Sequence, residues 1–186
     1  MTTTAETTTV TTQVHRVYIK ASAQRIWDAI TQPEWTARYG YTGLVESNLR
    51  PGGPFLIHPT PEFKAGAEAT GFPCPDPIVD GEVVEADPPR RLVTTWRMLM
   101  DPTMAEEPFT RLTYEIKQLS GGYCSLTVVH DCEGAPATFA LVAGSNEDMG
   151  AGGGHDWVLS DLKTLLETGE TMAAWVPAGD VGLPVD

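Results

Sequence analysis

The chain has 186 residues, of which 41% are apolar and 20% charged, a composition typical of one soluble globular domain with a sizeable core. Its 25 acidic residues outnumber the 12 basic ones, which gives a formal net charge of −13. Because this charge repels phosphate backbones and anionic lipid headgroups, it argues against nucleic acids and membrane surfaces as partners.

The amino-terminal segment and the cysteines point to one compartment. Residues 1–12 are rich in threonine and contain no apolar run, so we expect a disordered tail and no signal peptide. No stretch approaches the ~20 apolar residues of a membrane span. The three cysteines form no Cys-x-x-Cys pair and are odd in number, so no disulfide framework is expected. These features predict a cytoplasmic protein.

Periodicity at the start of the domain predicts a strand followed by two short helices. Residues 13–20 alternate between polar and apolar, with Val17 and Ile19 on one face. Ser22 is a favourable N-cap, and the apolar residues after it recur at helical spacing. Pro33 ends this helix because it disfavours helical geometry at the preceding residue. A second helical turn follows it.

The middle of the chain is predicted to form strands and turns. Six further strands are expected at 41–46, 54–58, 78–85, 91–98, 110–117 and 123–131. In the last of these, His130 shares a face with Leu126 and Val128. Residues 59–77 lack periodicity and are predicted to form a long loop, which in a compact domain is usually functional. Two further loops, at 101–108 and 133–148, are expected, the second with some helical content.

A long helix is predicted over 149–168, with Val158, Leu162 and Leu165 on its inward face and Gly169 beyond its end. Residues 170–186 are expected to be a tail, which leaves 13–169 as a single domain. One long terminal helix after a run of antiparallel strands suggests a sheet curled around that helix with a space between them.

Three segments carry a family resemblance. Residues 19–31 resemble the opening segment of START-like proteins (the SRPBCC or Bet v 1-like superfamily), and more narrowly of the group homologous to the C-terminal domain of the Hsp90-ATPase activator. That group typically has a Pro-Gly-Gly turn, matched by 51–53. Its Gly-x-Val-x-Glu strand, which continues through Pro-Pro into Arg-Leu-x-x-Thr-Trp, is matched by 81–96. The similarity runs in the same order over about residues 13–170.

The resemblance implies an α+β helix-grip fold. A curved antiparallel sheet of six to seven strands would wrap around the long C-terminal helix, and two short helices would follow the first strand. It also implies an interior cavity for apolar or aromatic molecules, but no single reaction, so a function inferred from the fold is an analogy. The family's final helix usually starts with Gly-Trp, whereas His155 and Asp156 separate Gly154 from Trp157 here. This change falls near the expected cavity mouth and leaves the ligand open.

Aromatic side chains and histidines are the candidate ligand-binding residues, since small-molecule sites are apolar pockets with a few polar groups. We predict the following cavity lining: Tyr39, Tyr41, Phe55, His58, Phe63, Trp96, Met98, Tyr114, His130 and His155. Any one of these side chains could instead simply fill the core. No metal site is expected, because no His or Cys pair has ligand spacing. No cofactor motif is present either; the glycine-rich run 150–154 lacks the P-loop lysine.

The leading hypothesis is a non-enzymatic protein that holds a hydrophobic, aromatic or polyketide-like small molecule for antibiotic biosynthesis or for self-resistance by sequestration. A second hypothesis is a polyketide cyclase or aromatase in which His130 and His155 transfer protons, since histidine suits neutral pH. A third is a co-chaperone-like module that binds a protein through an exposed apolar patch. The chain is expected to be a monomer or a homodimer.

Overall fold

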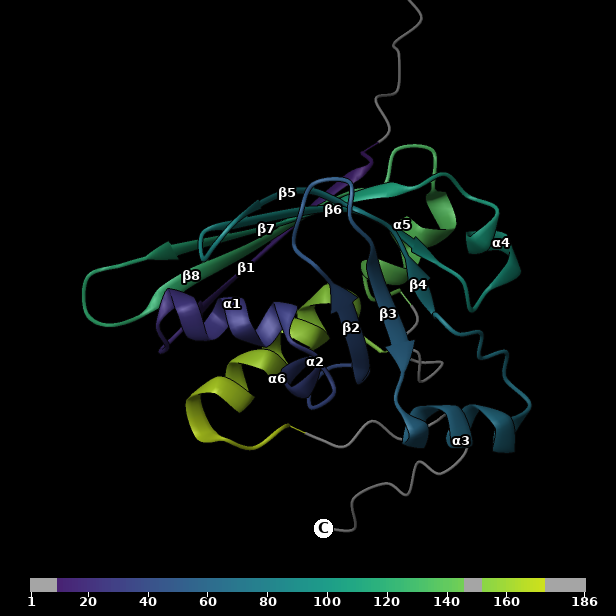
Figure 1. Ribbon diagram of the computed structural model, residues 1–186, viewed down its shortest axis with the longest axis horizontal. Coiled ribbons are helices and arrows are strands. Elements are labelled where there is room, and N and C mark those ends of the chain that lie inside the picture. The colour runs from purple at the N-terminus through teal and green to yellow at the C-terminus, as the bar shows by residue number, and fades with distance from the viewer. Residues whose placement is uncertain (1–9, 146–151, 173–186) are drawn as a thin grey trace, which may run out of the picture.

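An antiparallel sheet and one long helix dominate the computed structural model of the protein, which describes residues 10–145 and 152–172 (Figure 1). The strands are β1 (Thr12–Ile19), β2 (Gly43–Ser47), β3 (Phe55–Pro59), β4 (Val79–Asp80), β5 (Val83–Asp87), β6 (Arg91–Met98), β7 (Thr110–Gln118) and β8 (Cys124–Asp131). Their order in the sheet is β1-β8-β7-β6-β4-β3-β2, and β5 also pairs with β6. This is the helix-grip fold that the sequence predicts.

The described residues hold one strand more than the six to seven expected, because the predicted strand 78–85 is interrupted. Its two halves, β4 and β5, both pair with β6. Between them, a side chain at Gly81 would collide with the carbonyl oxygen of Thr95. The break lets β4 pair with β3 as well and so extends the sheet to β2.

Six helices accompany the sheet in the described residues: α1 (Ala23–Thr31), α2 (Pro33–Thr36), α3 (Pro61–Thr70), α4 (Pro102–Ala105), α5 (Pro136–Val142) and α6 (Gly154–Thr168). Helices α1, α2 and α6 lie on the same side of the sheet (Figure 1). The hydroxyl of Ser22 caps α1 by accepting a hydrogen bond from Arg25 N at 3.2 Å. Ile26, Trp27 and Ile30 are buried, as their helical spacing predicts.

The prediction of a structureless loop at 59–77 is wrong, because this segment contains α3. Thr60 caps the helix, Pro61 occupies its first position, and Gly71 ends it in the left-handed region at φ 70°. Only Phe63 and Ala67 of this helix are buried. Because only two of its side chains point inward, the helix has no continuous apolar stripe. The hydrophobic periodicity of the sequence therefore does not predict it. The expected loop at 101–108 likewise contains the short helix α4.

We expect the cap of α3 to contribute measurably to stability. Thr60 is 6% exposed, and its hydroxyl accepts a hydrogen bond from Phe63 N at 3.1 Å. Thr60→Ala should therefore lower the free energy of unfolding by about 1 kcal/mol in urea denaturation. Thr60→Ser retains the hydroxyl and should lose much less. Equal losses in the two variants would show that the cap does not contribute.

Helix α6 begins later than the sequence predicts. The predicted start at residue 149 falls outside the described residues, but residues 152 and 153 are described and are not helical. The inward stripe is confirmed: Leu159, Leu162 and Leu165 are buried, and Val158 packs against the core. Gly169 follows the last turn at φ 87°.

Candidate functional site

The register of the sheet brings polar side chains into line across its concave face. Thr94 on β6 pairs with Leu112 on β7, which pairs in turn with His130 on β8. His130 also pairs with Gln13 on β1. Because directly paired residues point to the same face of a sheet, these four side chains form one row.

A second row lies one step along the strands. Tyr114 on β7 pairs with Val128 on β8, and Val128 pairs with His15 on β1. The row beyond it is apolar and consists of Ile116, Leu126 and Val17. The concave face therefore has a polar part, where histidines, a threonine and a tyrosine gather, and an apolar part.

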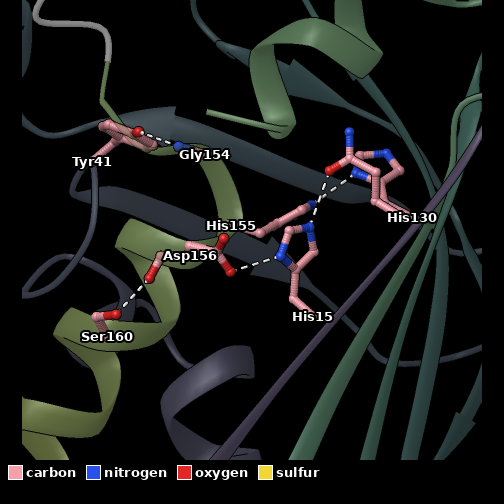
Figure 2. Close-up of polar contacts among 8 residues, drawn as sticks. His15, Tyr41, His130, Gly154, His155, Asp156 and Ser160 are labelled. Atoms are coloured by element: carbon pink, nitrogen blue, oxygen red, sulfur yellow. Dashed lines mark hydrogen bonds and ion pairs between the residues drawn. The ribbon is translucent and has the colours of Figure 1, made fainter. Parts of the chain in front are cut away.

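Helix α6 starts over the polar part and brings a third histidine to it (Figure 2). Nε2 of His155 lies 2.9 Å from Nδ1 of His130. Nε2 of His130 lies 2.8 Å from the hydroxyl of Thr110, and that hydroxyl donates to the carbonyl oxygen of Trp96, also at 2.8 Å. His130 is fully buried, and its ring packs edge-to-face with the ring of Trp96. The prediction that both histidines face inward is thus confirmed by their contact.

His15 completes what we call the histidine cluster, which consists of His15, His130 and His155. The rings of His15 and His155 have centroids 5.3 Å apart. Nδ1 of His15 lies 2.7 Å from a carboxylate oxygen of Asp156, and its Nε2 lies 3.0 Å from the side-chain oxygen of Gln13 (Figure 2). Asp156 itself is largely exposed.

Sequence reasoning missed His15 and Gln13, although the signal was present. The alternation that places Val17 and Ile19 inward places residues 13 and 15 on the same face. The apolar members alone predict the inward face, and the polar members of the same alternation lie on it as well.

Burial keeps His130 and His155 uncharged at neutral pH. Desolvation is the main cause that lowers the pKa of His130, with the neighbouring His15 as a second cause. For His155, desolvation again comes first, followed by repulsion from His130 and His15, and Asp156 only partly offsets this lowering of the pKa. The pair is therefore neutral, and its rings act as hydrogen-bonding groups.

Two tyrosines of the predicted lining are shielded from bulk water. Burial raises the pKa of Tyr114 to about 12, and also raises that of Tyr39 far above its ordinary value. The hydroxyl of Tyr39 donates to the carbonyl oxygen of Ala29 at 3.1 Å. Tyr41 lies at the start of α6, where its hydroxyl accepts a hydrogen bond from Gly154 N at 3.2 Å (Figure 2).

The remaining predicted residues divide into two groups. Phe55 and Trp96 are buried in the main core, and Met98 packs against it. His58 lies on the opposite face of β3 from Phe55, and bonds Asp76 and Glu46 at 2.5 and 3.1 Å. Phe63 is buried on α3, a helix that contacts β3. The structure therefore brings neither His58 nor Phe63 to the histidine cluster.

Two searches of the described residues give negative results. Over 10–145 and 152–172, no three His, Cys, Asp or Glu side chains are arranged to hold a metal ion. Within the same ranges, no helix combines the length and the apolar character that crossing a bilayer requires.

Comparisons with known proteins show the family to which this chain belongs. Residues 20–167 match the family model described as activator of Hsp90 ATPase homolog 1-like protein. No curated protein matches the chain significantly.

Among solved structures, the solution structure of CalU16 from Micromonospora echinospora aligns with a TM-score of 0.57 at 18% identity, covering 94% of this chain and 75% of CalU16. DynU16, from the dynemicin biosynthetic locus, aligns with a TM-score of 0.60 at 19% identity over 88% of this chain and 49% of DynU16. The Aha1 dimer from Colwellia psychrerythraea aligns with a TM-score of 0.56 at 17% identity, covering 86% and 98% of the two chains. At these identities the likeness shows a shared fold.

Proposed function

Because the chain belongs to the activator of Hsp90 ATPase homolog 1-like family, we propose that it uses this fold to bind a hydrophobic small molecule of aromatic or polyketide-like structure. The ligand lies between α6 and the concave face of the sheet, next to the histidine cluster. The role is non-enzymatic, either sequestration of a toxic compound for self-resistance or presentation of a biosynthetic intermediate.

One observation supports the proposal: polar side chains gathered on the concave face remain partly accessible. Tyr114 on β7 and His155 at the start of α6 are both only partly buried. Desolvation still raises the pKa of Tyr114 to about 12 and lowers that of His155. A ligand between the helix and the sheet would contact these two side chains.

A second observation supports the same place. The hydroxyl of Thr94 is buried and has no hydrogen-bond partner, one of two such side-chain atoms among the described residues. Buried polar atoms in folded proteins nearly always have partners, so an exception needs an explanation. Thr94 lies in the same row as His130, and a bound ligand would supply the missing partner.

Burial of ligand surface supplies the affinity in this proposal. An aromatic ligand that buries roughly 300 Å² of apolar surface gains about 7 kcal/mol before the costs of ordering are subtracted. The likeness to DynU16, a protein of the dynemicin biosynthetic locus, is compatible with a ligand from antibiotic biosynthesis. A net charge of −13 further favours a neutral ligand over an anionic one.

Calorimetric titration with 1,8-dihydroxyanthraquinone tests this function. We expect saturable binding with a negative heat-capacity change, the mark of apolar burial, and quenching of tryptophan fluorescence through Trp96. Thr94→Leu should weaken binding at least ten-fold by filling the hollow. Its matched control, Thr94→Val, removes the hydroxyl with little change in volume and should weaken binding only about five-fold, the effect of one lost hydrogen bond. Absence of saturable binding to the wild-type protein would overturn the proposal.

The contact between His130 and His155 favours a second candidate, a cyclase or aromatase. Nδ1 of His130 and Nε2 of His155, 2.9 Å apart, are within range for proton transfer. Replacing both with glutamine should then abolish cyclisation of a linear poly-β-keto thioester. Unchanged turnover in the double variant would remove this candidate.

A further inference from the structure

The hydrogen-bond partners of His130 determine where the protons of two histidines lie. The Thr110 hydroxyl donates its single proton to the carbonyl oxygen of Trp96, so towards His130 it can only accept. Nε2 of His130 must therefore carry a hydrogen. In a neutral ring Nδ1 is then an acceptor, and the hydrogen bond at 2.9 Å has to come from Nε2–H of His155. Both rings are thus Nε2–H tautomers.

The partners of His15 differ from those of His130. The amide nitrogen of Gln13 donates to the carbonyl oxygen of Phe139 at 2.8 Å, so its oxygen is the atom that faces Nε2 of His15. The carboxylate of Asp156 faces Nδ1. Both partners present acceptor oxygens to the ring, and the carboxylate of Asp156 adds a negative charge beside it.

This proton assignment leaves one ring nitrogen, Nδ1 of His155, available to accept a hydrogen bond. It carries a lone pair, and none of the residues that the structure describes bonds to it. His155 is only partly buried, so the atom is open to a ligand. The ring of His15, with its centroid 5.3 Å away, opposes a positive charge on His155 and so lowers its pKa. The lone pair therefore accepts a hydrogen bond more readily than it takes a proton.

We propose that Nδ1 of His155 accepts a hydrogen bond from a phenolic or enolic hydroxyl of the bound ligand, so that the site selects hydroxylated aromatic molecules over their ethers. This inference rests on the proposed function and names its ligand class. A phenol is a strong hydrogen-bond donor, and the low dielectric of a buried site strengthens the hydrogen bond that it donates. The arrangement also favours binding over proton abstraction.

Nitrogen NMR of the histidine-labelled protein tests the proton assignment without any ligand. At pH 7, we expect pyrrole-type signals for Nε2 and pyridine-type signals for Nδ1 in both His130 and His155. An Nδ1–H tautomer at His155 would overturn the inference, because that atom could not then accept.

A matched pair of probes, 2-naphthol and 2-methoxynaphthalene, tests ligand selection. In the second probe a methyl group replaces the hydroxyl hydrogen of the first, so it cannot donate a hydrogen bond. We expect the wild-type protein to prefer 2-naphthol by about five-fold, the effect of one net hydrogen bond. In His155→Gln, the amide nitrogen replaces the Nε2 donor but no acceptor stands at Nδ1, so the preference for 2-naphthol should vanish. His155→Asn places its oxygen near the Nδ1 position and should keep the preference.

The outcomes separate this inference from the function on which it rests. If the wild-type protein binds neither probe, the proposed function fails and the inference fails with it. If it binds both equally, the hydrophobic site stands and only the inference is overturned. If the preference persists undiminished in His155→Gln, another group accepts the hydroxyl, and the assignment to His155 is wrong.

Discussion

Asp161→Ala is expected to lower the free energy of unfolding by about 3 kcal/mol. Asp161 lies on α6, is 1% exposed, and accepts hydrogen bonds from Gly40 N at 2.8 Å and Met172 N at 2.6 Å. Through these bonds it fastens α6 to the loop after α2 and to the segment after α6. Alanine removes both acceptors and leaves the buried N–H of Gly40 unpaired, and each bond to a charged group contributes about 1.5–3 kcal/mol.

Two variants make the Asp161 measurement specific. Asp161→Asn retains one acceptor oxygen and should lose less stability than alanine in urea denaturation at pH 7. Ser160→Ala alters an exposed neighbour whose hydroxyl bonds only within the helix, and should stay within about 0.5 kcal/mol of the wild type. A loss below 1 kcal/mol for Asp161→Ala would show that the two bonds are replaced by water.

Most of the fold is predictable because its elements follow simple periods. Strands β7 and β8 each present one buried face, as alternation over 110–117 and 123–131 predicts. The stripe of Leu159, Leu162 and Leu165 predicts which side of α6 faces the sheet. Family-like turns in a fixed order then determine how these elements connect. Local pattern and connection together define the helix-grip fold.

What the sequence does not predict depends on contacts between distant segments. Asp161 lies beside the inward stripe of α6, and only the loop at Gly40, 121 positions away, shows why a carboxylate is buried there. His15 and Asp156 are 141 positions apart. The contact between His130 and His155 was foreseeable because each ring's face follows from its own element. The contact of His15 with Asp156 was not, because it joins segments from opposite ends of the chain.

The apolar part of the concave face stabilises the fold, and the polar part is where we propose that the ligand binds. Over the apolar part, leucines of α6 and Leu126 form one core that holds helix and sheet together. Over the polar part, the same helix contacts the sheet through hydrogen-bonded rings, and Thr94 has a buried hydroxyl without a partner. Evenly apolar packing would have left no polar atom unpaired. The unpaired hydroxyl of Thr94 lowers stability at the place where we propose that the ligand binds, and such local losses are common at functional sites.

The neutral histidine pair should make the protein lose stability in mild acid. In the unfolded chain a histidine has a pKa of about 6.5, and burial lowers the pKa of His130 to about 4 and that of His155 further. Below pH 6.5 the unfolded state therefore binds protons that the folded state does not, and the linkage relation makes stability fall as the pH falls. Each ring contributes about 1.4 kcal/mol per pH unit, so about 2.5 kcal/mol per ring is lost by pH 4.5.

Urea unfolding of the wild-type protein and of His155→Gln, measured from pH 7.5 to 4.5, isolates this effect. Glutamine at 155 keeps a donor to His130 but does not titrate, so the dependence of stability on pH should become shallower by about one proton. The groups that face the pair are His15, Asp156, Thr110 and the Trp96 ring, and all are unchanged in the variant. Subtracting the two curves therefore cancels the titration of carboxylates elsewhere. Parallel curves would mean that folding does not lower the pKa of His155, and the neutral pair on which the ligand assignment depends would be wrong.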